Sequence, residues 1–99
     1  MVSRSKAGRP VKYSENMCQV AIDMMRHGAS KIELAAHLGV NRDTISAWRK
    51  KYPDFNAAIE KGYTFSQAWW MNLGYANLFN KNFNYRLWRL NMINRFRWR

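Results

Sequence analysis

The chain contains one cysteine, two prolines and five glycines, and it has no long apolar run. The lone Cys18 excludes a disulfide bond within the chain and fits a reducing compartment. No segment approaches the roughly 20 apolar residues that span a bilayer, and the N-terminus lacks the apolar stretch of a secretory signal. We therefore expect a cytoplasmic protein with no membrane partner.

Acidic residues are also scarce: six Asp and Glu stand against 17 Lys and Arg, and none follows Glu60. Hydrolytic metal sites need clustered carboxylates, and phosphate-binding loops need a glycine-rich turn that ends in lysine; the sequence has neither. His27 and His37 have no cysteine or carboxylate at ligand spacing. We therefore expect that the protein is not an enzyme and that it binds no metal and no cofactor. The net charge of +11 indicates a polyanionic partner, most commonly nucleic acid.

Glycine, proline and β-branched residues are few, and Met, Ala and Leu dominate the apolar set, which predicts an all-α fold. A chain of 99 residues can form one small domain with an appendage, but not two full cores. We expect a flexible basic arm over residues 1–12 and a three-helix helix-turn-helix head over residues 13–53. A long helical hairpin over residues 54–99 would then form an oligomerisation core.

Residues 30–52 follow the pattern of a DNA-binding helix-turn-helix. Ser30 and Glu33 have the spacing of a capping box, which begins a helix. Gly39 then ends this helix, because a residue without a Cβ readily takes the left-handed conformation that such a stop requires. Asn41 is expected to cap the second helix of the motif.

In that second helix, Ile45 and Trp48 are spaced to face inward, and Pro53 is expected to close it. The opposite face would enter the major groove, where the N-terminal residues of the helix reach base edges. The candidate base-reading residues are Arg42, Asp43, Ser46 and Ala47. The candidate phosphate contacts are Thr44, Arg49, Lys50 and Lys51. The alternative is an ordinary helical hairpin with a solvated charged face.

The basic arm contains Gly8-Arg9-Pro10, which is like the core of minor-groove hooks, so Arg9 is a further candidate DNA contact. A flexible tail that adds only salt-dependent affinity is the alternative. Between the arm and the helix-turn-helix, Ser14 is expected to cap a first helix that ends at Gly28.

After Pro53, Asp54 is expected to cap a helix that continues through Asn80. Apolar and small residues recur along it with a period of 3.5, which indicates a seam for a partner helix. The seam would pack either on the last helix of the chain or on other copies. The residues expected to carry oligomerisation are Phe55, Ile59, Gly62, Trp69, Leu73 and, in the last segment, Trp88.

Residues 81–99 have apolar side chains on two sides with arginines between them. A helix is favoured, although alternation near the terminus leaves a strand possible. This segment could bind nucleic acid by stacking and charge, or lie on an acidic membrane face. It could also form an oligomer core with its basic residues in solvent.

Three parts of the sequence resemble the small terminase subunits of tailed bacteriophages. The first is Gly8-Arg9-Pro10 with Lys12-Tyr13, and the second runs from Ser30 to Trp48 and leads to Tyr52-Pro53-Asp54-Phe55. The third and most specific is the closing set Phe83-Asn84, Leu87-Trp88, Asn91-Met92, Asn94-Arg95-Phe96 and Trp98.

The resemblance implies a DNA-binding head on a helical core that assembles into a ring larger than a dimer. Such a ring binds double-stranded viral DNA in the host cytoplasm and works with a large terminase subunit, which holds the ATPase and nuclease. In the family that the sequence resembles, contact with the large subunit is generally placed in a tail that follows the closing motif. The alternative function is a dimeric helix-turn-helix transcriptional regulator or a transposase-type DNA-binding head, and stoichiometry separates ring from dimer.

Overall fold

The computed structural model describes residues 11–98, and within this range the chain is entirely helical. Its helices are α1 (Asn16–Arg26), α2 (Lys31–Leu38), α3 (Arg42–Lys51), α4 (Pro53–Ala76) and α5 (Tyr85–Phe96). The described part of the chain contains no strand, so the predicted all-α class is confirmed and the strand alternative near the C-terminus is not found there.

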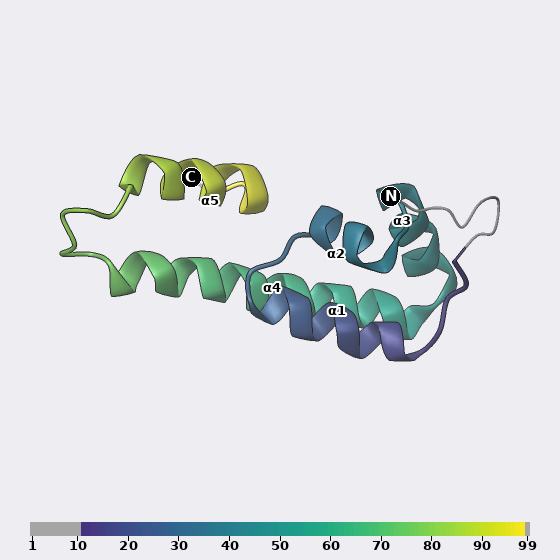
Figure 1. Ribbon diagram of the computed structural model, residues 1–99. Helices are drawn as coiled ribbons and strands as arrows, with labels where there is room; N and C mark the ends of the chain where they lie inside the picture. Colours follow the sequence, from purple (N-terminus) through teal and green to yellow (C-terminus); the bar gives the residue numbers. More distant parts are fainter. Residues whose placement is uncertain (1–10, 99) are drawn as a thin grey trace.

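Helix α4, with 24 residues, is the longest element and sets the elongated shape of 49 × 31 × 21 Å. Helix α1 lies along its first half, with α2 and α3 close by, and α5 folds back along its second half (Figure 1). Helices α1, α3 and α5 therefore pack on α4, and α2 packs on α1 and α3.

One hydrophobic core joins α1, α2, α3 and the beginning of α4. Its buried members are Ala21, Met25, Leu34, Ala35, Ile45, Trp48, Phe55 and Ile59. Phe55 and Ile59 belong to α4, which the predicted division at residue 53 assigns to the oligomerisation core. The head core thus extends past Pro53 into the long helix.

The local signals predicted around α2 and α3 are all present. The Ser30 hydroxyl accepts a hydrogen bond from the Glu33 N–H (3.2 Å), and the Ser30 N–H donates to Glu33 Oε1 (2.8 Å), which completes the capping box. Gly39 ends α2 with φ of +75°. Asn41 Oδ1 accepts from the Thr44 N–H (3.1 Å) and caps α3.

Two predicted helix starts are wrong. Glu15, one residue after Ser14, is the N-cap residue of α1, and the Ser14 hydroxyl bonds the Asn16 side chain instead of a backbone N–H. Asp54 does not cap α4, because Pro53 is already its first residue. Proline fits this position since the missing N–H would have no partner in the first turn.

The end of α4 also differs from the prediction. The helix stops at Ala76, four residues before the expected Asn80, and a turn of eight residues leads to α5. Asn84 Oδ1 then accepts from the Leu87 N–H (2.9 Å), which caps α5. Leu78 and Phe79, which the prediction placed inside this helix, therefore lie in the turn.

Candidate nucleic-acid interface

The orientation of α3 is fixed by two buried side chains. Ile45 and Trp48 are 2 % and 9 % exposed, and the Trp48 ring meets Phe55 edge to face with centroids 5.9 Å apart. Because these residues are three apart on a helix, they hold one face of α3 against the core and leave the other in solvent.

The solvent face of α3 carries most of the predicted DNA contacts. Its exposed members are Arg42, Asp43, Ser46, Ala47, Lys50 and Lys51. Arginine can donate two parallel bonds to a guanine edge, serine can bond either kind of base, and lysine suits phosphates. Thr44 is only half-buried, and its N–H is bonded by the Asn41 cap, so it contributes to the start of α3.

Arg49 lies differently from the phosphate contact that the sequence predicts. Its Nε donates to Asn56 Oδ1 (2.8 Å), and its Nη2 lies 3.9 Å from a Glu60 oxygen. The side chain is 27 % exposed and points to α4. In this structure Arg49 therefore joins α3 to α4, and the exposed cations of this face are Arg42, Lys50 and Lys51.

Tyr13 fixes the place where the basic arm meets the head, a role the sequence did not reveal. Its ring stacks on Tyr52 with centroids 3.8 Å apart and meets Trp48 at 5.5 Å. The Tyr13 hydroxyl lies 3.3 Å from Cys18 Sγ, and burial followed by this hydrogen bond raises the pKa of Tyr13. The chain thus enters the head beside α3, while Arg9 lies outside the described residues.

A second group of contacts, which we name the Arg95 junction, joins the α1–α2 turn to α4 and α5. It consists of Gly28, Glu33, Trp70 and Arg95. Arg95 Nη1 donates to the Gly28 carbonyl (3.3 Å) and to Glu33 Oε1 (3.1 Å), and the guanidinium lies 4.5 Å from the Trp70 ring centroid. The Trp70 Nε1–H also donates to the Gly28 carbonyl (2.9 Å).

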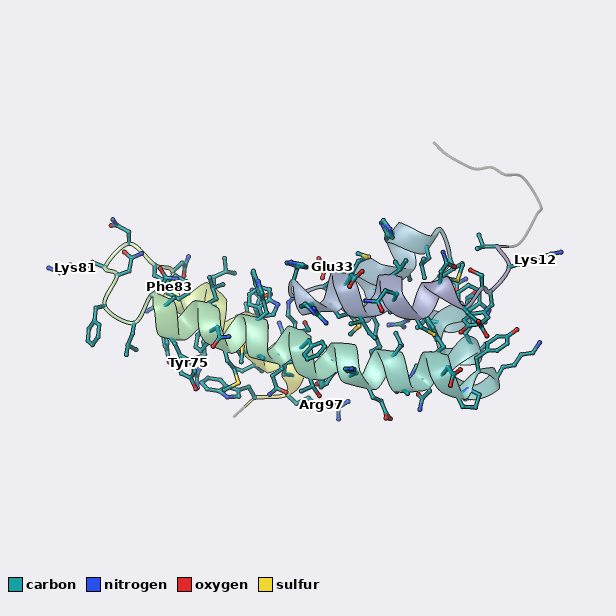
Figure 2. The ribbon with its side chains drawn as sticks, turned by 90° about the horizontal axis from the view of Figure 1, so that it is seen from below. Lys12, Glu33, Tyr75, Lys81, Phe83 and Arg97 are labelled. Carbon is teal, nitrogen blue, oxygen red and sulfur yellow. The ribbon has the colours of Figure 1, made fainter. Side chains whose placement is uncertain are left out.

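Glu33 carries both the capping box of α2 and the ion pair with Arg95. Its pKa is lowered, first by the hydrogen bond from the Ser30 N–H and further by Arg95. Figure 2 shows Glu33 on the side of α4 where α1 lies. The junction is bordered by a hollow of about 580 Å³, which includes Trp69 and Asp23 in its lining. The head and α5 are therefore in direct contact.

The predicted oligomerisation residues divide into two groups. Phe55, Ile59 and Gly62 are buried inside the chain's own head, against α1 and the core. A Cβ on Gly62 would lie 2.7 Å from Met25 Sδ, so glycine allows α1 to come close. The expectation that these three face the last helix or another copy does not agree with the structure, because α1 occupies their face.

The other three predicted residues lie along the second half of the α4 seam and on α5. Trp69 is 38 % exposed and covers Gly28, while Leu73 and Trp88 are half-buried. The Trp88 Nε1–H donates to the Trp70 carbonyl (2.7 Å), and its ring packs against Gly74. Trp88 thus holds α5 to α4 within one chain.

Large apolar side chains are exposed instead at the α4–α5 end of the molecule. They are Tyr75, Leu78, Phe79, Tyr85, Leu87 and Leu90, which we call the distal apolar residues. Figure 2 shows Tyr75 and Phe83 at this end. Phe79 is 93 % exposed. None of these residues belongs to the predicted seam, since they lie elsewhere on α4, in the turn or on α5.

Within residues 11–98, no His, Cys, Asp and Glu side chains gather in a group that could hold a metal ion. None of the helices in that range combines the length and apolar character needed to cross a bilayer. Comparison with protein-family models, curated proteins and solved structures gave no match for the chain.

Proposed function

We propose that the protein is a non-enzymatic, DNA-binding subunit of an oligomer, of the kind represented by the small terminase subunits that recognise viral DNA for packaging. The observation that carries this proposal is the exposed face of α3. Burial of Ile45 and Trp48 leaves Arg42, Ser46 and Lys50 together in solvent on a helix whose start is capped. The resemblance of three sequence segments to that family gives the packaging role.

In this mechanism α2 and α3 act as a helix-turn-helix. The N-terminal part of α3 enters the major groove, where Arg42 and Ser46 reach base edges. Lys50 and Lys51, one to two turns further along, bind phosphates on the flanking backbone. The basic arm, including Arg9, adds contacts in the adjacent minor groove.

Assembly of several copies raises the effective DNA affinity of each head. A single exposed helix with a few cations binds weakly, whereas tethered heads convert later binding steps into intramolecular ones. The distal apolar residues support this part of the proposal, because several large apolar side chains exposed at one end of a molecule are typical of protein–protein contacts. The large terminase subunit is the further partner that the resemblance implies.

The test of DNA recognition compares two substitutions on α3. Arg42→Ala should weaken binding to the preferred duplex and reduce the difference between preferred and random duplexes, because it removes a base contact. Lys50→Ala should weaken binding to all duplexes equally and lower the salt slope by about 1, as expected for one phosphate contact. Fluorescence anisotropy over a salt series measures both.

An unchanged affinity and salt slope in both variants would contradict the assignment of α3. Arg49→Ala serves as the matched comparison, since Arg49 is held by Asn56 and Glu60 on the side of α3 that faces α4. Arg49→Ala should lower the midpoint of thermal unfolding and leave the DNA affinity of the folded protein nearly unchanged. A clean dimer that binds a palindrome would instead favour the transcriptional regulator.

A further inference from the structure

The outward face of α5 is strongly basic. Arg86, Arg89 and Ile93 recur at spacings of three and four, which places them on one face of the helix. Arg97 follows the end of α5 and lies on the same side, beside Arg89 and Ile93. The opposite face carries Trp88 and Met92, which pack toward α4. Arg86, Arg89 and Arg97 are all exposed, so α5 presents a row of guanidinium groups to solvent.

No acidic group offsets these arginines. Among residues 11–98, the ion pairs involve Arg49 and Arg95, and neither lies in this row. The sequence has no acidic residue from Lys61 to its end. The one carboxylate that reaches α5, that of Glu33, pairs with Arg95 and not with this row. A row of arginines without an ion pair is complementary to a polyanion, and arginine binds phosphate in a bidentate manner that lysine cannot reproduce.

The row borders a hollow with an aromatic wall. Arg89, Ile93, Arg97 and Trp98 line this hollow, which has a volume of about 640 Å³. The Trp98 ring packs edge to face against Trp88, with centroids 5.5 Å apart. Guanidinium groups beside an indole ring are the side chains that bind phosphate together with a sugar or base.

Arg97 also occupies a backbone conformation that its side chain does not favour. It ends α5 with φ of 55° and ψ of 37°, the left-handed region where glycine is the usual residue. It is the one non-glycine residue of the described chain with positive φ. Figure 2 shows the Arg97 side chain directed into solvent, on the opposite side of α4 from Glu33.

We propose that the outward face of α5, formed by Arg86, Arg89 and Arg97 beside Trp98, is a second nucleic-acid contact that binds the phosphate backbone without reading sequence. This inference rests on the proposed function, because the proposed function identifies the polyanion as DNA. It adds a contact separate from α3, on the part of the molecule otherwise assigned to assembly. The heads would select the sequence, and the α5 faces would hold the flanking backbone.

The test removes the three charges together. The variant R86Q/R89Q/R97Q is compared with K31Q/K61Q/K81Q, which loses the same charge from exposed lysines elsewhere. Three lost phosphate contacts lower the slope of log affinity against log salt by about 2.7 for duplex DNA. Raising the salt from about 50 to about 200 mM should therefore cost the wild type about 40-fold more affinity than the α5 variant.

The control variant should keep a slope closer to that of the wild type, and both variants should keep the preference for one duplex sequence. An α5 variant with a wild-type slope, or a change that the lysine variant reproduces, would overturn the proposal. Light scattering on the same samples adds a second criterion. Loss of DNA binding together with loss of assembly mass would also overturn it, because the arginines would then act between copies.

Failure of this inference is distinguishable from failure of the proposed function. If the α3 variants weaken DNA binding and the α5 variant does not, the α5 contact is wrong and α3 recognition stands. If the α5 variant weakens binding and the α3 variants do not, α3 recognition is wrong and the α5 contact stands. Wild-type binding to anionic phospholipid vesicles that is lost in the α5 variant, without an effect on DNA, would also overturn the proposal.

Arg97→Gly gives an independent check. Glycine relieves the left-handed conformation at the end of α5, so the midpoint of thermal unfolding should rise. The same substitution should lower the salt slope of DNA binding by about 0.9, since one phosphate contact is lost. A higher midpoint with an unchanged slope would exclude Arg97 from the contact.

Discussion

Arg95 contacts residues from three different elements, although it stands near the end of the chain. It donates to the Gly28 carbonyl and to Glu33, and it lies over the Trp70 ring. The Glu33 side chain is 52 % exposed, so this ion pair contributes little, whereas the partly buried bond to Gly28 and the contact with Trp70 contribute more. Arg95 therefore stabilises the arrangement of the head relative to α5.

Replacing Arg95 by alanine should lower the free energy of unfolding by about 2 kcal/mol, from one charged hydrogen bond and one cation–π contact. Arg95→Lys should restore little of this loss, because an ammonium group lacks the planar fork that stacks on Trp70. Arg89→Ala, on the exposed face of the same helix, should change stability by less than about 0.5 kcal/mol. Urea unfolding measures all three; equal effects of Arg95→Ala and Arg89→Ala would contradict the junction.

Glu33 makes this arrangement dependent on pH. Its pKa in the folded chain lies below 4.5, the ordinary value of a glutamate, because the Ser30 N–H and Arg95 favour the carboxylate. A carboxyl group with a lowered pKa stabilises the fold above its unfolded pKa, and this contribution is lost as the pH falls through the folded pKa. Stability from Glu33 is therefore complete at neutral pH and decreases in acid.

Glu33→Gln should consequently destabilise the protein at neutral pH and have a smaller effect in acid, once the pH has fallen through the folded pKa of Glu33 and the wild-type carboxyl has itself taken up a proton. The comparison uses urea midpoints of both proteins at the two pH values. Glu60→Gln is the control, since the Glu60 oxygen lies at 3.9 Å from Arg49 and accepts no capping bond. If Glu33→Gln lowers stability equally at both pH values, Glu33 does not make the stability dependent on pH.

At the scale of elements, two glycines with left-handed backbones make the turns that precede and follow α2. Gly28 has φ of +96° and Gly39 has φ of +75°. Their surroundings differ, because a Cβ on Gly28 would lie 2.6 Å from the Trp69 ring, whereas a Cβ on Gly39 would meet only Val11 at 4.0 Å. The turn before α2 is thus packed against α4, whereas the turn after α2 has free space around its glycine.

Gly39→Ala should cost about 1 to 2 kcal/mol from backbone strain alone. Gly28→Ala should cost about 2 to 5 kcal/mol, because the same strain is joined by a collision with the Trp69 ring. Thermal or urea unfolding of the two variants side by side checks the difference. Equal losses would mean that Trp69 moves freely and that the α1–α2 turn is not packed on α4.

The elements that the sequence predicted well depend on neighbouring residues. The capping box at Ser30, the left-handed Gly39 and the Asn41 cap involve partners within four positions, so local chemistry determines them. The exposed face of α3 followed from the spacing of Ile45 and Trp48 in the same way.

The features that the sequence could not predict depend on distant partners. The α4 seam has a helical period, but periodicity does not say which helix covers it, and α1 covers its first half. Arg95 and Gly28 are 67 positions apart, and no local pattern links them. The contacts of Arg49 with Asn56 and Glu60 could not be predicted for the same reason, since both partners lie on another helix.

At the scale of the whole molecule, charge and apolar surface are unevenly distributed. All six acidic residues lie before Lys61, and the later part combines arginines with the distal apolar residues. Figure 1 shows α3 beside the first half of α4 and the turn to α5 at the other end of that helix. If α3 binds DNA as we propose, the exposed apolar side chains near the other end are suited to assembly. The heads would then remain free for DNA.

The measurement that tests this account most directly is the molar mass of the full chain in solution, by light scattering behind a sizing column at moderate salt. The single-chain mass is 11.8 kDa. We expect a species of several chains, larger than a dimer, that gains mass when a duplex carrying the preferred site is added. A monomer or a clean dimer, unchanged by DNA, would contradict a DNA-binding assembly of this kind.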